Sequence, residues 1–148
     1  MTMNYTPKLF VDSNIFIETF KKAGLKEASE LWEFILSNFD KLDFTINLIV
    51  KNEITYHLFF KRNLITLEEV ENLLNSFTSM EINLKIEDMM FSFIEKYNIK
   101  PNDALILSTC KFYNIKYLIS MDKDFTEVCQ KENIILINSV QIANSIFK

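Results

Sequence analysis

Short apolar runs of strand-forming residues alternate with longer segments of helical periodicity, and this alternation constrains the fold more than any other feature. The apolar runs occupy residues 8–11, 44–46, 115–120 and 134–137, with a weaker candidate at 80–82. Helical spacing covers residues 13–20, 25–38, 47–58, 67–77, 86–97, 99–114 and 125–132. We therefore expect an α/β fold in one domain spanning residues 1–148, with a parallel sheet of about five strands covered by helices on both faces.

Residues that interrupt helices are scarce, because the 148 residues include one glycine, Gly24, and two prolines. One glycine cannot build the glycine-rich loop of a Rossmann or P-loop nucleotide site, so both classes are excluded. The net charge of −4 gives no general attraction to nucleic acid, although a local cationic track could still bind a phosphate backbone. The cations that could line such a track, or simply form solvated helix faces, are Lys21, Lys22, Lys26, Lys51, Lys61 and Arg62.

The two cysteines, Cys110 and Cys129, have no CxxC spacing, which indicates free thiols in a reducing compartment. The first residues lack the basic start and apolar stretch of a signal peptide. No run approaches the roughly 18 apolar residues that cross a bilayer. We expect a cytoplasmic protein that does not enter the membrane.

Four carboxylates lie where an α/β sheet would bring them together. They are Asp12, Glu53, Asp103 and Asp122. Asp12 and Asp122 each follow an apolar run, and Asp103 is in the first turn of a helix that begins near Pro101. Since the carboxyl ends of parallel strands share one edge of a sheet, these side chains are expected to converge there.

Each of these acids also has an ordinary structural explanation. Asp12 and Asp122 can cap helices, and Asp103 suits the positive end of a helix dipole. Glu53 is harder to explain this way, because it lies in mid-helix beside an apolar stripe. Converging carboxylates destabilise one another unless a cation is present.

Oxygen ligands favour Mg²⁺ or Mn²⁺, so we expect one or two of these ions. Asp12 and Asp103 are the expected primary ligands, and Asp122 and Glu53 complete the site. Such a centre activates water for attack on a phosphodiester. Zinc is disfavoured, because His57 is the only histidine and no further nitrogen or sulfur ligand accompanies it.

The segments LFVDSN, NEI, PNDALIL and LISMDKDF together resemble the PIN domain family across almost the whole chain. The resemblance implies a three-layer sandwich and an Mg²⁺- or Mn²⁺-dependent ribonuclease whose catalytic and metal-binding acids are the four carboxylates above. It assigns supporting roles to Ser13, Asn14, Ser120 and Asp124. Small members of the family resemble the toxins of VapBC toxin–antitoxin pairs, which are usually homodimers inhibited by a small antitoxin.

The leading hypothesis is thus a metal-dependent endoribonuclease that acts as a toxin. A non-catalytic PIN scaffold and a ribosomal-RNA processing nuclease remain as alternatives. A phosphotransfer enzyme of the haloacid-dehalogenase type is a weaker one, because that chemistry needs an aspartate where this chain has Asn14. The region between Arg62 and Tyr97 matches no diagnostic residues of the family, so it does not indicate the RNA target.

Overall fold

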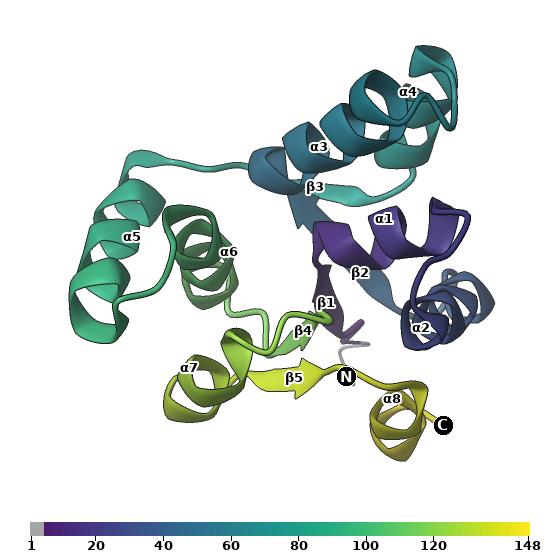
Figure 1. The fold of residues 1–148 in the computed structure, drawn as a ribbon. Helices are drawn as coiled ribbons and strands as arrows, with labels where there is room; N and C mark the ends of the chain where they lie inside the picture. Colours follow the sequence, from purple (N-terminus) through teal and green to yellow (C-terminus); the bar gives the residue numbers. More distant parts are fainter. Residues whose placement is uncertain (1–4) are drawn as a thin grey trace.

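The computed structural model describes residues 5–148, and its centre is a sheet of five parallel strands (Figure 1). The strands lie in the order β3-β2-β1-β4-β5, and each neighbouring pair is parallel. Their bounds are β1 Lys8–Val11, β2 Asp43–Asn47, β3 Thr78–Met80, β4 Tyr117–Ile119 and β5 Ile135–Ile137. The predicted parallel sheet is confirmed.

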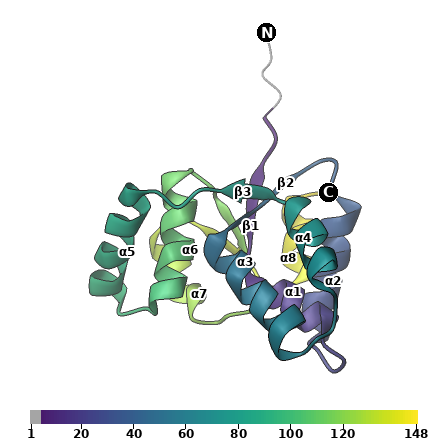
Figure 2. The ribbon, with the colours of Figure 1, turned by 90° about the horizontal axis from the view of Figure 1, so that it is seen from above.

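Helices cover both faces of this sheet. They are α1 Ser13–Phe20, α2 Lys26–Ser37, α3 Leu48–Ile54, α4 Leu67–Asn75, α5 Leu84–Tyr97, α6 Pro101–Phe112, α7 Phe125–Lys131 and α8 Val140–Ile146, with a π-helix, η1, continuing α3 over Thr55–Lys61. In both Figure 1 and Figure 2, α5, α6 and α7 lie on one side of the sheet, and α1, α2 and α8 lie on the other. The predicted three-layer arrangement is confirmed. Within residues 5–148, no helix is both long and apolar enough to span a bilayer.

The central strand β1 is buried on both faces, as a strand between two helix layers must be. Leu9, Phe10 and Val11 have no exposed surface, and neither do Leu118 and Ile119 of the neighbouring β4. Polar residues directly follow the buried strands at the carboxyl ends of β1 and β4, so these polar residues lie at the edge of the core.

The strand order creates a switch point between β1 and β4. The chain passes from β1 to β2 through α1 and α2, and it returns from β3 to β4 through α5 and α6 on the opposite face. The connections diverge at the carboxyl ends of β1 and β4, which is where open α/β sheets bind ligands. The Asp12 amide donates to the Ile119 carbonyl at 2.9 Å, so the first predicted site residue lies at this point.

Several element boundaries differ from the sequence-based expectation. The weak strand expected at residues 80–82 lies at Thr78–Met80, because its register is set by parallel pairing with β2, in which Met80 is opposite Asn47. The strand expected at residues 115–120 is shorter, and helix α8 was not predicted. A capping box of Thr66 and Glu69 opens α4.

Candidate metal centre

Asp12 is a buried carboxylate held by hydrogen bonds at the start of α1. It caps the helix, since one of its oxygens, Oδ1, accepts from the Ser13 amide at 2.8 Å. The other oxygen, Oδ2, accepts from Ser120 Oγ at 2.7 Å and from Asn14 Nδ2 at 3.1 Å. With 5% of its surface exposed, Asp12 has little freedom to move. Asp12 therefore caps α1, as the sequence allowed, and it also lies in the acidic region.

Asn14 joins the two strand ends that flank the switch point. Its Nδ2 group faces Asp12 and also donates to Ser120 Oγ at 3.3 Å, and its Oδ1 accepts from the Met121 amide at 3.1 Å. A second aspartate at this position, as a haloacid-dehalogenase-type enzyme requires, would lose both donated bonds and repel Asp12. The local structure therefore uses Asn14 as a clamp and disfavours the phosphotransfer alternative.

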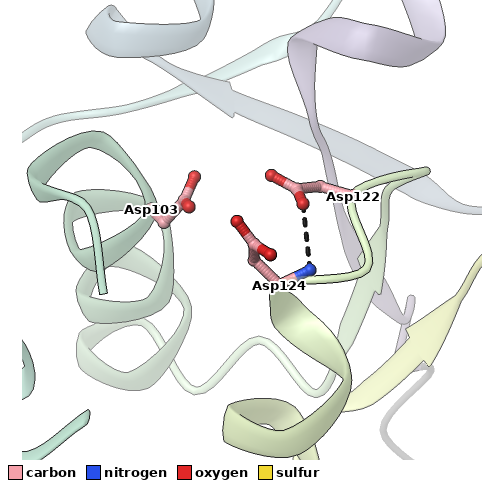
Figure 3. Close-up of side chains that lie close together, drawn as sticks. All are labelled: Asp103, Asp122 and Asp124. Atoms are coloured by element: carbon pink, nitrogen blue, oxygen red, sulfur yellow. Dashed lines mark hydrogen bonds between the residues drawn. The ribbon is translucent and has the colours of Figure 1, made fainter. Parts of the chain in front are cut away.

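Three aspartates form the tightest acidic group within residues 5–148. One carboxylate oxygen from each of Asp103, Asp122 and Asp124 lies within 4.8 Å of the others. Figure 3 shows Asp103 projecting from α6 toward Asp122 and Asp124, which come from the segment between β4 and α7. Asp122 Oδ1 accepts from the Asp124 amide at 2.9 Å, and this turn aims both side chains toward α6. We call these three residues the aspartate triad.

The acids of this region are coupled electrostatically. Burial first, and then the charges of Asp122, Asp12 and Asp124, raise the pKa of Asp103 from 3.8 to about 6. Burial also raises the pKa of Asp12 to about 6 against the hydrogen bonds from Ser120 and Ser13, and Glu53 and Asp122 add to the increase. Burial and the charge of Asp103 raise the pKa of Glu53.

The structure therefore brings all four predicted carboxylates into one electrostatic neighbourhood, and it adds Asp124 to the closest group. Sequence reasoning gave Asp124 only a supporting role. The available signal was the Asp-x-Asp spacing of Asp122 and Asp124, which a tight turn converts into two side chains on the same side.

The residues present fit a hard divalent cation. The triad offers only carboxylate oxygens, the ligands that Mg²⁺ and Mn²⁺ prefer. Asp103 Oδ2 is buried and has no hydrogen-bond partner among the described residues, so one acceptor is left for a ligand. Bringing a cation to this oxygen would relieve both its missing contact and the mutual repulsion of the triad.

A hollow of about 550 Å³ opens beside the triad, between the turn that precedes α6 and helix α7. Asp103 and Asp124 form part of its lining, together with the cations Lys100 and Lys123. Its size falls within the range of roughly 300–1,000 Å³ that is usual for ligand pockets. The acids are therefore reachable from solvent through a space whose lining includes two lysines alongside Asp103, Asp124 and Glu127.

Ser120→Ala is expected to lower the free energy of unfolding by about 2 kcal/mol at pH 7, because the buried Asp12 carboxylate loses a hydroxyl donor. Urea denaturation measures this change. Ser108→Ala is the matched control, since Ser108 is equally buried and its hydroxyl donates at 2.7 Å to the Ala104 carbonyl rather than to a carboxylate. Equal effects of the two substitutions would show that the Ser120 hydroxyl does not support Asp12.

Comparison with known proteins agrees with this fold. The sequence model of the PIN domain matches residues 9–131. Ribonuclease VapC2 of Methanocaldococcus jannaschii is 35% identical over 136 residues, covering 82% of this chain and 89% of the relative. Ribonuclease VapC6 of the same organism is 28% identical over 142 residues, covering 78% and 93%.

Among solved structures, the fold is similar to VapBC2 from Rickettsia felis bound to a DNA fragment from its promoter. The TM-score is 0.69 at 18% identity, over 89% of this chain and 98% of that one. The extent of the family match, together with the identity to VapC2, means that this chain belongs to the PIN domain family.

Proposed function

We propose that the protein is a divalent-metal-dependent endoribonuclease that hydrolyses RNA phosphodiester bonds and acts as the toxin of a toxin–antitoxin pair. The observation that supports this most directly is the aspartate triad, coupled to Asp12 and Glu53 at the switch point of the sheet. Two curated relatives named as VapC ribonucleases support the same activity.

Asp103, Asp122 and Asp124 would hold one or two Mg²⁺ or Mn²⁺ ions, with Asp12 and Glu53 completing the site. A bound ion of this kind supplies an activated water and stabilises the leaving oxygen. Asp12 contributes a fixed negative charge, because Ser13, Asn14 and Ser120 hold its position. This ligand set adds Asp124 to the four acids expected from the motifs.

Glu53 is suited to take a proton from the attacking water. Its pKa is raised by burial and by the charge of Asp103, which brings it closer to the working pH than that of an ordinary glutamate. The water oxygen forms the new bond to phosphorus and one proton of that water goes to the Glu53 carboxylate. The bond from phosphorus to the leaving ribose oxygen breaks, and this oxygen takes a proton from solvent. The 2′-hydroxyl takes no part, so no cyclic phosphate is formed.

The substrate and partners follow from the same assignment. The 550 Å³ hollow beside the triad would hold a nucleotide adjacent to the cleaved bond, with Lys100 and Lys123 facing its phosphate. A small antitoxin protein and a second copy of the chain complete the proposed set of partners, in keeping with the family resemblance. We also propose that residues 1–148 form one domain.

Wild-type protein incubated with total cellular RNA and millimolar Mn²⁺ is expected to cut specific RNAs and to lose that activity in EDTA. Mapping the termini by sequencing tests the chemistry, because hydrolysis by water leaves no 2′,3′-cyclic phosphate. Cyclic phosphate ends, or full activity in EDTA, would contradict the metal-dependent mechanism. An absence of cleavage with Mn²⁺ would instead favour the non-catalytic scaffold.

A further inference from the structure

A second charged hollow lies away from the acids, and it gathers cations from two distant parts of the sequence. It has a volume of about 260 Å³ and is lined by Lys21, Lys22, Ala23, Arg62 and Leu64. We call it the basic pocket. Arg62 is the single arginine of the chain, and Lys61 precedes it at the end of η1. No role in the proposed cleavage chemistry accounts for this feature.

Tight turns hold both walls of the basic pocket. On one wall, a Cβ atom at Gly24 would lie 1.6 Å from the Glu18 carbonyl oxygen, so only glycine allows the loop after α1 to fold back on that helix. On the other wall, Asn63 adopts a positive φ of 49°, and the Leu64 amide donates to the Leu58 carbonyl at 2.7 Å. The loops that carry the cations are thus fixed by the backbone.

The positive charge of the pocket is largely uncompensated. Lys21 pairs with Glu18 at 2.8 Å, whereas Lys22, Lys61 and Arg62 form no ion pair with any residue from 5 to 148. The neighbouring His57 is affected by this positive charge. Burial first, and then the charges of Lys61, Arg62 and Lys21, lower the pKa of His57. In a chain of net charge −4, such a concentration of cations favours an anionic ligand.

The basic pocket is connected to the acidic site by two packed helices. Helix α1 begins directly after Asp12 and packs against both α3, which carries Glu53, and η1 (Figure 1). The eight residues of α1 span about 12 Å, so the loop after α1 lies a short distance along the surface from the acids. It lies at the far end of α1 from the triad, whereas the 550 Å³ hollow adjoins the triad itself.

We propose that the basic pocket binds a backbone phosphate of the single-stranded RNA outside the cleaved bond, and so sets RNA affinity while the acids perform the chemistry. This inference rests on the proposed ribonuclease function. Arg62 presents a planar fork that matches phosphate oxygens, and Lys22 adds a point charge. Helix η1 also exposes the stacked rings of Tyr56 and Phe60, which suit unpaired bases.

RNA binding by Lys22→Glu/Arg62→Glu tests the pocket, because both side chains are exposed and the fold should tolerate the change. Fluorescence anisotropy with a labelled single-stranded RNA of mixed sequence, in an Asp103→Asn background that prevents cutting, gives the dissociation constant at several salt concentrations. We expect about tenfold weaker binding at low salt. We also expect the slope of log K against log salt to shrink by about 0.7, for one lost phosphate contact on a single strand.

Lys41→Glu/Lys116→Glu is the matched control. These exposed lysines precede β2 and β4, at the opposite edge of the sheet, and their reversal changes the net charge equally. If the basic pocket binds RNA, the control changes affinity by less than about twofold, since screened distant charges contribute little. Equal losses of RNA affinity in the two double variants would overturn the proposal. Unchanged RNA affinity in Lys22→Glu/Arg62→Glu would also overturn it, and would favour an acidic protein as the ligand of the basic pocket.

Failure of this inference can be told apart from failure of the proposed function. Wild-type protein that cuts RNA with Mn²⁺, together with unchanged RNA affinity in Lys22→Glu/Arg62→Glu, would remove only the role of the basic pocket. Absence of Mn²⁺-dependent cleavage in the wild type would remove the nuclease assignment. Arg62→Lys separates charge from geometry: an affinity between wild type and the double variant supports bidentate phosphate binding.

Discussion

Asp103→Asn is expected to lower the rate of Mn²⁺-dependent RNA cleavage by more than about a hundredfold, because groups that merely support a metal ligand already cost about 10- to 100-fold. Asp103 lies at the centre of the acidic site. Its carboxylate is in the aspartate triad with Asp122 and Asp124, and its charge is coupled to Asp12 and Glu53. An amide at this position removes one negative charge and one of the oxygens suited to a hard cation.

Single-turnover cleavage rates at pH 7 and saturating Mn²⁺ measure this effect. Asp88→Asn is the control, because Asp88 is exposed on α5 and the substitution changes the net charge equally. Far-UV circular dichroism checks that both variants are folded. Wild-type rates in folded Asp103→Asn would sink the assignment of the triad as the metal centre, whereas equal losses in the two variants would point to a general effect of charge.

The position of the site could be predicted from sequence because it depends on topology. Asp12 and Asp122 directly follow β1 and β4, and a parallel sheet brings the ends of its strands to one edge. The grouping of Asp124 with Asp103 could not be predicted in the same way. It depends on a turn in which the Asp122 carboxylate accepts from the Asp124 amide, a local hydrogen bond that the Asp-x-Asp spacing permits without requiring.

Elements that depend on tertiary packing were the hardest to predict. Helix α8 carries a usable start signal, since Ser139 Oγ accepts from the Ile142 amide, but the short segment has no long apolar periodicity. The π-helical geometry of η1 has no recognised sequence signature here.

The basic pocket shows the same limit. Of the six cations considered as a track, Lys21, Lys22 and Arg62 line the pocket because α1 packs against η1. Lys51 lines a different hollow, between α3 and α4, so spacing along the chain alone could not separate the two groups.

Metal-free Asp103→Asn is expected to be more stable than the wild type at pH 7 and equally stable near pH 4. The folded-state pKa of Asp103 is raised from 3.8 to about 6, so between these values the folded protein binds more protons than the unfolded chain. Wild-type stability therefore falls as pH rises from about 4 to 6, and the loss is complete above the folded-state pKa. Because Asp103 is only half-buried, solvent screening reduces the gain from the substitution to about 1 kcal/mol, or a few degrees in Tm.

Mn²⁺ should make the wild type more stable than Asp103→Asn at pH 7. A ligand that binds only the folded state raises the melting temperature, and the intact triad binds the ion more tightly than a triad with one amide. Melting curves at pH 4 and pH 7, each with and without millimolar Mn²⁺, test the expected stability difference without metal and its reversal by metal. Asp88→Asn is expected to follow the wild type in each condition. A metal-free Asp103→Asn less stable than the wild type at pH 7 would mean that the ionised carboxylate stabilises the fold by itself. The mutual repulsion that argues for a cation would then be absent.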